Sequence, residues 1–310
     1  LLGRGWATWH ARRRWPALAL LAPLALIAAV IPFAVMAPPL SSPLVYDDVS
    51  EVHPQSSFAG RFGSAIDFLG YDLDGTSFEA GDQFDLTLYW HALAQPQEHY
   101  TLAVQLVSTV PGETDLLINL NTWTGGGNYP TGNWHPGDVI VDRYRLQLPD
   151  TVVRTQAWYL QVLLFNADDG IRLPVTLDNQ LVGEFAVLTS LRVGATDPED
   201  LSPPELDRLA APIRFGEALA LDGVGTTPGD EALGLTLWWR SIAPVDADYI
   251  VFVHLYDADG QLVATADAPP LAGGFPTSMW QPGDRVLDER IVAWPTKDGN
   301  TPRLGIGWYD

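Results

Sequence analysis

The chain has 310 residues, of which 47% are hydrophobic and 18% are charged, and its formal net charge is −21. These values exclude a disordered tail and a wholly intramembrane protein, and the length suits two domains. The negative charge argues against nucleic acid as a partner. The absence of cysteine excludes disulfides, thiolate metal sites and a cysteine nucleophile.

The first segment of the chain predicts a membrane anchor. Residues 1–15 form a basic flank with four arginines and no acid, and residues 16–37 are almost purely apolar. A helix over 16–37 is long enough to cross a bilayer. Because arginine gathers on the cytoplasmic side, we expect a cell-membrane protein with a cytoplasmic N-terminus, membrane lipid as a partner and all later residues extracytoplasmic. A cleaved signal peptide is the alternative interpretation.

After an extended linker at 38–57, the sequence repeats itself. Residues 58–189 (copy 1) and 213–310 (copy 2) carry the same motifs in the same order, which indicates a duplication. A proline-rich linker at 190–212 separates them. The matched motifs are Phe62-Gly63 with Phe215-Gly216, Leu86–Trp90 with Leu235–Trp239, Pro136-Gly137-Asp138 with Pro282-Gly283-Asp284, and Asp142 with Asp288.

Both copies show the alternation of β-strands. Apolar residues fall on every second position of 84–90 and 233–239, which predicts strands with one buried face and places Trp90 and Trp239 in the core. Pro-Gly-Asp and Gly-Asp sequences mark turns between the strands. The predicted fold is therefore all-β, with two tandem antiparallel β-sandwiches, immunoglobulin-like or jelly-roll-like, after one transmembrane helix.

The duplication also predicts how copy 2 ends. Residues 160–165 align with 304–309, and copy 1 continues for about two more strands beyond that point, through Leu188. Copy 2 has no counterpart to those strands. We therefore expect copy 2 to be truncated here and the natural protein to extend past Asp310.

The sequence contains no catalytic motif, and we predict no catalytic, cofactor-binding or metal-binding residue in it. Two acidic stretches, Asp72-x-Asp74-Gly75 and Asp257-x-Asp259-Gly260, resemble pieces of a calcium loop. The other ligands of such a loop are missing, and Asp-Gly is also a common hairpin turn. The turn interpretation is favoured for both.

The chain has twelve tryptophans, and flat aromatic side chains on a β-sandwich are suited to stacking on sugar rings. Trp134 and Trp280 recur in matching loops and are expected to close one end of each domain. Trp123, Trp158 and Trp238 have no clear inward register. These three are therefore the candidates for exposure and for binding a ligand, with a glycan or another cell-envelope component as the partner.

The assembled motifs resemble a known family. They are Leu-Gly-Tyr-Asp at 69–72, Leu-Thr-Leu-Tyr-Trp at 86–90, Tyr-Pro-Thr at 129–131 and Gly-Gly-Phe-Pro-Thr-Ser-Met-Trp-Gln-Pro-Gly-Asp at 273–284. This order resembles the extracytoplasmic C-terminal region of bacterial multi-pass membrane glycosyltransferases of the dolichyl-phosphate-mannose protein mannosyltransferase type. In that family the catalytic acid lies in an early loop that no part of this chain matches.

Two functions follow as expectations. The resemblance implies a non-catalytic tail of a membrane glycosyltransferase that positions the acceptor or an envelope glycan. The alternative is a stand-alone, membrane-anchored surface protein with carbohydrate- or protein-binding modules.

Overall fold

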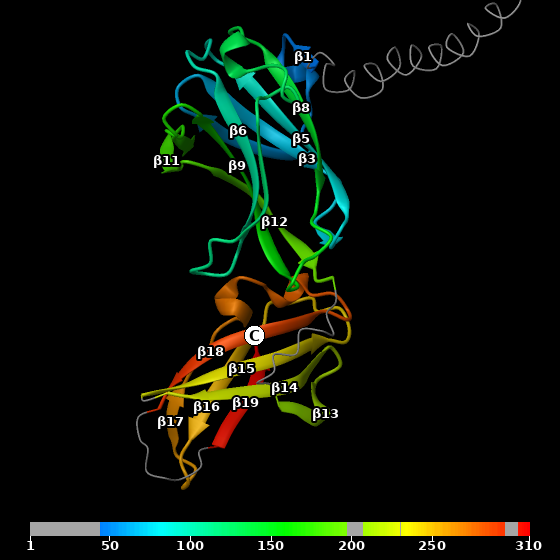
Figure 1. Ribbon diagram of the computed structural model, residues 1–310, viewed down its shortest axis with the longest axis vertical. Helices are drawn as coiled ribbons and strands as arrows, with labels where there is room; N and C mark the ends of the chain where they lie inside the picture. Colours follow the sequence, from blue (N-terminus) through cyan, green and yellow to red (C-terminus); the bar gives the residue numbers. More distant parts are fainter. Residues whose placement is uncertain (1–43, 197–206, 230, 295–302) are drawn as a thin grey trace, which may run out of the picture.

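The computed structural model describes residues 44–196, 207–229, 231–294 and 303–310 (Figure 1). The basic flank at 1–15 and the predicted transmembrane helix at 16–37 lie outside these ranges. Within them, no helix has the length and apolar character needed to cross a membrane. The described chain consists of strands β1 to β19 with short 3-10 helices between some of them, which confirms the all-β class.

Two sheets are built from residues 44–194. The seven-stranded sheet has the order β1-β8-β5-β3-β2-β10-β11, and the five-stranded sheet has the order β4-β12-β9-β6-β7. The strands are β1 Leu44–Tyr46, β2 Ser56–Phe62, β3 Ile66–Leu73, β4 Ser77–Glu79, β5 Gln83–Ala92, β6 Tyr100–Ser108, β7 Leu116–Thr122, β8 Val139–Gln147, β9 Gln156–Asn166, β10 Val175–Leu177, β11 Gln180–Gly183 and β12 Ala186–Gly194. The 3-10 helices are η2 Val49–Glu51 and η3 Thr131–Asn133.

Residues 207–309 form two further sheets, a four-stranded one in the order β13-β14-β15-β18 and a three-stranded one in the order β17-β16-β19. The strands are β13 Asp207–Phe215, β14 Leu219–Pro228, β15 Ala232–Ser241, β16 Ile250–Tyr256, β17 Leu262–Thr265, β18 Arg285–Ala293 and β19 Arg303–Tyr309. The 3-10 helices are η4 Pro270–Gly273 and η5 Thr277–Met279.

The strand order recurs between the two halves. The run β8-β5-β3-β2 in the seven-stranded sheet has the same order as β18-β15-β14-β13, and β9-β6-β7 has the same order as β19-β16-β17. Local geometry recurs as well. Gly63 and Gly216 both have φ of 58°, a left-handed conformation that glycine adopts at little cost, and each ends a Phe-Gly step into the next hairpin.

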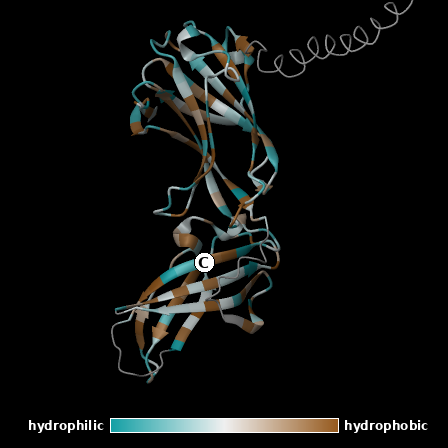
Figure 2. Ribbon diagram, in the orientation of Figure 1, coloured by the Kyte–Doolittle hydropathy of each residue, from teal (hydrophilic) through white to brown (hydrophobic). Residues whose placement is uncertain are grey.

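The alternating apolar residues of the strands form two hydrophobic cores. Along the strands, hydrophobic and hydrophilic residues alternate in both halves (Figure 2). The inward residues of one sheet face those of its partner, so each pair of sheets shares one cluster of buried side chains. Trp90 and Trp239 are fully buried, as predicted. Trp134 and Trp280 are also buried, and each indole N–H donates to the backbone of the loop it closes, at Tyr129 and Phe275.

Part of the predicted linker at 38–57 belongs to a sheet. Strand β1 pairs with β8 and forms one edge of the seven-stranded sheet, and β2 begins at Ser56. Val52 and Tyr46 pack with Tyr89, Val139 and Val141 on the outer face of the sheet. The sequence did not predict this strand because it is short and lies among proline and serine residues. Its apolar residues cover Tyr89, an aromatic residue that faces outward from the sheet.

The predicted linker at 190–212 is also shorter in the structure. Strand β12 continues to Gly194, and β13 begins at Asp207. Ladder pairing with β9 and with β4 carries β12 beyond the predicted boundary at 189, because each backbone group of Leu191 to Val193 has a strand beside it.

The two halves lie end to end (Figure 1), and a buried ion pair joins them. Arg192 on β12 donates from Nε to Asp284 Oδ2 at 2.7 Å and from its second terminal nitrogen to Asp284 Oδ1. Both side chains are only 5% exposed. Arg192 also donates to Glu79 Oε1 at 2.8 Å, so the guanidinium bridges copy 1 and copy 2.

Further contacts join the two halves. The Thr109 hydroxyl contacts the carbonyls of Ala157, at 2.7 Å, and Gly274. Gln281 Nε2 donates to Ser77 Oγ at 2.8 Å. A Cβ on Gly274 would lie 2.8 Å from the Val110 Cα, so the two backbones meet more closely than any side chain would permit.

Candidate functional site

The structure separates the three tryptophans that the sequence grouped together. Trp123 is 48% exposed, which agrees with its predicted exposure. The expected exposure is wrong for the other two, because Trp158 is 7% exposed and Trp238 is 2% exposed. The prediction that Trp123 binds a ligand stays a prediction.

The two buried tryptophans are covered for different reasons. Trp158 lies on β9 in phase with Leu160 and Val162, and all three side chains enter the core between the sheets. This alternation with a period of two is visible in the sequence and indicates that Trp158 is buried. Trp238 instead points away from the core residue Trp239, and the Arg285 guanidinium lies 5.2 Å from its ring centroid. This cation–π contact across neighbouring strands has no signature in the sequence.

Trp123 belongs to a small surface that we call the loop-end site, made of Trp123, His99, Gln95 and Gly132. The His99 and Trp123 rings are 6.3 Å apart between centroids and tilted by 44°. Gln95 Nε2 donates to the Gly132 carbonyl at 2.9 Å, which ties two loops together. A Cβ on Gly132 would lie 2.6 Å from the His99 ring, so glycine leaves the space in which this ring lies.

The loop after Trp123 is held by a buried carboxylate. Gly125, Gly126 and Gly127 all have positive φ, and the Gly126 N–H donates to Asp142 Oδ1 at 3.0 Å. The Tyr144 hydroxyl donates to Asp142 Oδ2 at 2.5 Å. Burial raises the pKa of Asp142 to about 6, against the lowering effect of these hydrogen bonds.

Copy 2 holds the matching loop with a different partner. Asp288 Oδ1 accepts from the Leu271 N–H at 3.1 Å, and Oδ2 accepts from Arg290 at 2.7 Å. Burial raises the pKa of Asp288, while the Arg290 charge opposes this shift. The matched aspartates therefore anchor loops in both copies.

The two candidate calcium stretches have structural roles; Asp72 lies in strand β3, and only the stretch at Asp257 forms the expected turn. Asp72 accepts from the Gln55 N–H at 2.7 Å and from the Tyr89 hydroxyl at 2.5 Å. Asp257 Oδ1 accepts from the N–H groups of Asp259 and Gln261, at 3.0 and 2.8 Å. In the ranges that the structure describes, no three His, Cys, Asp or Glu side chains are grouped so that they could hold a metal ion.

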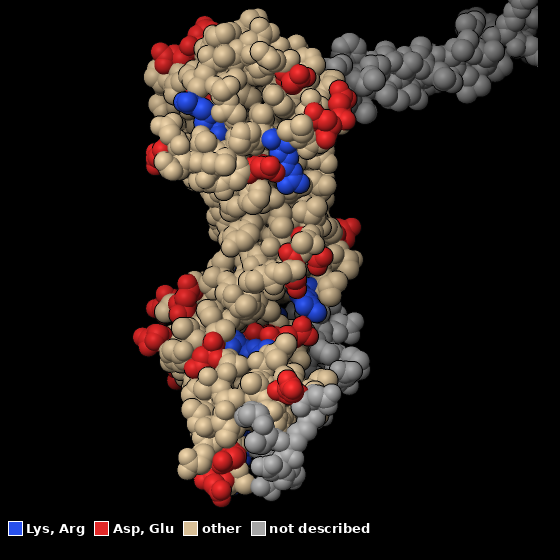
Figure 3. Space-filling view, turned by 90° about the vertical axis from the view of Figure 1, so that its left-hand side faces the viewer, with Lys and Arg blue, Asp and Glu red and all other residues tan. Residues whose placement is uncertain are grey.

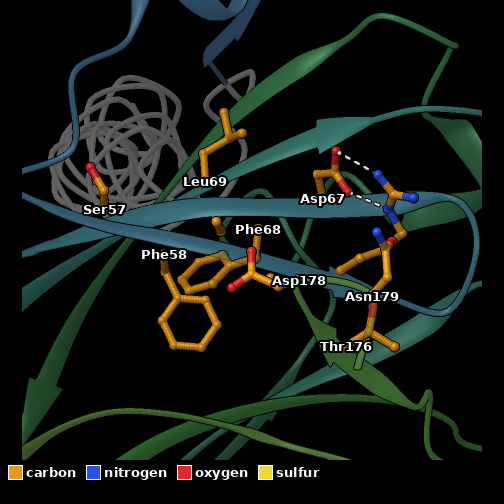
Figure 4. A pocket seen from close by; sticks show the side chains of 11 residues that line it. Ser57, Phe58, Asp67, Phe68, Leu69, Thr176, Asp178 and Asn179 are labelled. Atoms are coloured by element: carbon orange, nitrogen blue, oxygen red, sulfur yellow. Dashed lines mark hydrogen bonds and ion pairs between the residues drawn. The ribbon is translucent and has the colours of Figure 1, made fainter. Parts of the chain in front are cut away.

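A hollow of about 390 Å³ lies over β2, β3 and the β10–β11 turn (Figure 4). Its polar side includes an ion pair, with Arg61 Nε 2.6 Å from Asp67 Oδ1. Phe58 lies beside Phe68 on its other side, with ring centroids 5.3 Å apart. The charges of Arg61 and Asp67 pair with each other, and the described residues that line the hollow include no exposed tryptophan such as the one in the loop-end site.

The sequence matches no protein-family model and no curated protein. Several solved structures align with the chain. One of them, a DUF4785 family protein from Legionella pneumophila, has 11% identity and a TM-score of 0.24, over 80% of this chain and 48% of that one.

The second, from a study of carbohydrate-binding modules of the β-sandwich superfamily, has 8% identity and a TM-score of 0.19, over 81% of this chain and 100% of that one. The third is the collagen adhesin of S. aureus, with 8% identity and a TM-score of 0.14, over 83% and 99%. At TM-scores this low, none of the three likenesses supports an argument about this chain, whose candidate site is defined by its own residues.

Proposed function

We propose that this chain is a non-catalytic, extracytoplasmic glycan-binding region made of two tandem antiparallel β-sandwiches, held at the cell membrane by the span at 16–37. The observation that carries the proposal is Trp123. Among the tryptophans that the structure describes, its side chain alone falls in the exposed class, and it lies beside the exposed His99. A half-exposed indole next to hydrogen-bonding groups suits a sugar ring, which is apolar on its C–H face and polar at its edge.

The positions of the buried acids support a binding role over a catalytic one. Asp142 and Asp288 have raised pKa values, a property shared with many catalytic acids. Both carboxylates nevertheless accept hydrogen bonds from loop backbone at the end of their domain. Their burial serves to fix the loops, and in copy 1 the fixed loop is the one that follows Trp123.

The parent protein is part of the proposal. The motif order in both copies supports a tail of a multi-pass glycosyltransferase, in which the glycan-binding region would position the acceptor. The alternative is a stand-alone surface protein that uses the same modules. Upstream sequence distinguishes these two: further spanning segments before residue 1 support the enzyme tail, and a start codon directly before Leu1 contradicts it.

Replacing Trp123 with alanine is expected to weaken glycan binding at least tenfold, which corresponds to about 1.4 kcal/mol. The reason is that alanine removes the stacking face but leaves the loop hydrogen bonds in place. Calorimetric titration of the full chain in detergent micelles with soluble neutral polysaccharides measures the effect. Tyr309→Ala is the matched control, since Tyr309 is an exposed aromatic residue, 41% accessible, in copy 2. Equal affinities for the two variants would contradict the role of Trp123.

The proposed topology is testable because the chain has no cysteine of its own. A membrane-impermeant maleimide applied to intact cells is expected to label Ser64→Cys, an exposed position in copy 1. The same reagent is expected to leave Ala7→Cys unlabelled until the membrane is permeabilised, because Ala7 belongs to the basic flank. Labelling of Ala7→Cys alone in intact cells would reverse the proposed orientation.

A further inference from the structure

The outer face of the five-stranded sheet carries a row of amide side chains. Gln161 on β9, Gln105 on β6 and Asn119 on β7 are direct cross-strand partners. Gln161 Nε2 donates to Gln105 Oε1 at 2.9 Å, and Gln105 Nε2 donates to Asn119 Oδ1 at 3.0 Å. With strands about 4.8 Å apart, the row is about 10 Å long.

This row leaves hydrogen-bonding capacity at both ends. Gln161 Oε1 can accept, Asn119 Nδ2 can donate, and each amide nitrogen has a second hydrogen. In the described part of the chain, neither Gln161 Oε1 nor Asn119 Nδ2 has a hydrogen-bond partner beyond the row. Asn119 is exposed, while Gln105 and Gln161 are half-buried by their neighbours, so the row is fixed in place yet open to solvent along one side.

An aromatic side chain stands next to the amides. Tyr159 lies two residues before Gln161 on β9, on the same face of the sheet, and is 40% exposed. Its ring gives the face an apolar surface beside the hydrogen-bonding row, and its hydroxyl reaches solvent. We call Gln105, Asn119, Tyr159 and Gln161 the amide face.

The amide face is uncharged in a very acidic protein. Its neighbours on the same side of the sheet are Ala103, Val107, Leu163, Val187 and Ser190. Elsewhere the acids are scattered over the surface of both copies (Figure 3). The next cation along β12 is Arg192, and its guanidinium is already paired with Asp284 and Glu79.

We propose that the amide face is a second binding surface, and that its ligand is a neutral polysaccharide chain. Hydroxyl groups donate and accept, as the amides do, and the apolar faces of sugar rings match Tyr159. A polyanionic chain would find no cation among these four residues. Arg172 lies on this side of the sheet, but it pairs with Phe165, four residues beyond Gln161. A polyanionic chain would also meet the negative field of the whole protein. The inference rests on the proposed glycan-binding function and assigns the ligand class and a separate contact surface.

Copy 2 does not repeat this surface. The positions that match Gln105, Gln161 and Asn119 hold His254, Gly305 and Thr265. His254 Nε2 lies 3.3 Å from Asp267 Oδ2, so a carboxylate lies against the centre of the row. The proposed binding of a neutral polysaccharide is therefore assigned to copy 1 only.

The test is electrophoresis of the full chain, in a non-ionic detergent, through gels that contain dextran, mannan, a soluble β-1,3-glucan or polygalacturonate. Tyr159→Ala and Gln105→Ala are each expected to raise the dissociation constant for a neutral polysaccharide about tenfold. The constant is obtained from how strongly the polysaccharide slows migration. Tyr309→Ala is the control for the first, since Tyr309 is 41% exposed on the matching strand of copy 2. Gln83→Ala is the control for the second, because Gln83 and Gln147 form a similar cross-strand amide pair on the other sheet.

The outcomes separate the two proposals. Weaker retardation of both amide-face variants, with unchanged controls and unchanged melting temperatures, supports the inference. Loss of retardation in Trp123→Ala together with unchanged amide-face variants overturns it and leaves the proposed function intact. Retardation by polygalacturonate alone overturns the assignment of a neutral ligand. If no polysaccharide retards the wild-type chain, the proposed function fails and the amide face fails with it.

Discussion

Replacing Arg192 with alanine is expected to destabilise the junction between the two copies by about 3–5 kcal/mol, the usual cost of leaving one member of a buried ion pair alone. Asp284 is only 5% exposed, and without the guanidinium its carboxylate would be buried with the Gln281 N–H as its remaining donor. Calorimetry of the full chain is expected to show a lower melting temperature and separate unfolding of the two copies. Hydrogen exchange is expected to increase around residues 281–284.

The matched control is Arg145→Ala. Arg145 binds Asp85 through two nitrogens, both at 2.7 Å, but the two side chains are 69% and 52% exposed. Because solvent screens such a pair, its loss is expected to have little effect on stability. Similar destabilisation by both substitutions would contradict a special role for the junction. A double replacement of Arg192 and Asp284 by alanine is expected to cost less than the sum of the single ones.

Replacing Asp142 with asparagine is expected to change how stability depends on pH. Burial raises the pKa of Asp142 from 3.8 to about 6 in the folded chain. The folded state therefore holds this proton more tightly than the unfolded state, and its contribution to stability is lost as pH rises from about 4 to above 6. The loss is on the order of 3 kcal/mol at 1.36 kcal/mol per pKa unit.

Asparagine keeps an acceptor for the Gly126 N–H but carries no charge, so the variant lacks this loss. Relative to the wild type, its free energy of unfolding is expected to increase between pH 4 and pH 7 by that amount. Urea titrations across this range measure the difference. Asp85→Asn is the control, because Arg145 lowers the pKa of Asp85 below its usual 3.8, so its pH-dependent change falls below about pH 4. Relative to the wild type, the stability of this variant is expected to stay nearly constant between about pH 4 and pH 7. A difference between Asp142→Asn and wild type that stays constant with pH would contradict the assignment.

Local periodicity allowed much of the fold to be predicted. The alternation at 84–90 and 233–239 indicated strands, and β5 and β15 contain both stretches. It also placed Trp90 and Trp239 in the core, where both are fully buried. Recurring turns indicated which strands correspond. These features were predictable because burial on one face of a strand imposes a period of two on the sequence.

Long-range pairing could not be predicted. Arg192 and Asp284 are separated by 92 positions, and neither the proline-rich stretch between the copies nor the turn before β18 indicates that they meet. The amide row was missed for the same reason. Gln105, Asn119 and Gln161 are isolated polar residues in three strands, and their alignment depends on cross-strand register, which the sequence of one chain does not give.

The exposure of the tryptophans shows the same limit. Trp158 was predictable, because it shares the phase of Leu160, whereas Trp238 was not. Its ring points outward and is covered by Arg285 from β18, a strand that begins far along the chain. Trp123 was identified as exposed because no strand pattern includes it. The sequence did not indicate that Trp123 lies beside His99 or that Asp142 holds the glycine loop after it, because these contacts form only in the folded chain.

The most direct test of a glycan-binding, extracytoplasmic region is an NMR titration of the full chain in micelles with a neutral polysaccharide that it binds. The indole N–H signal of Trp123, assigned from Trp123→Phe, and the side-chain amide signals of Gln105, Asn119 and Gln161 are predicted to shift in a saturable way. The buried indoles of Trp90 and Trp239 are predicted to stay unchanged. Neutral polysaccharides that leave the Trp123 and amide signals unmoved would contradict the account.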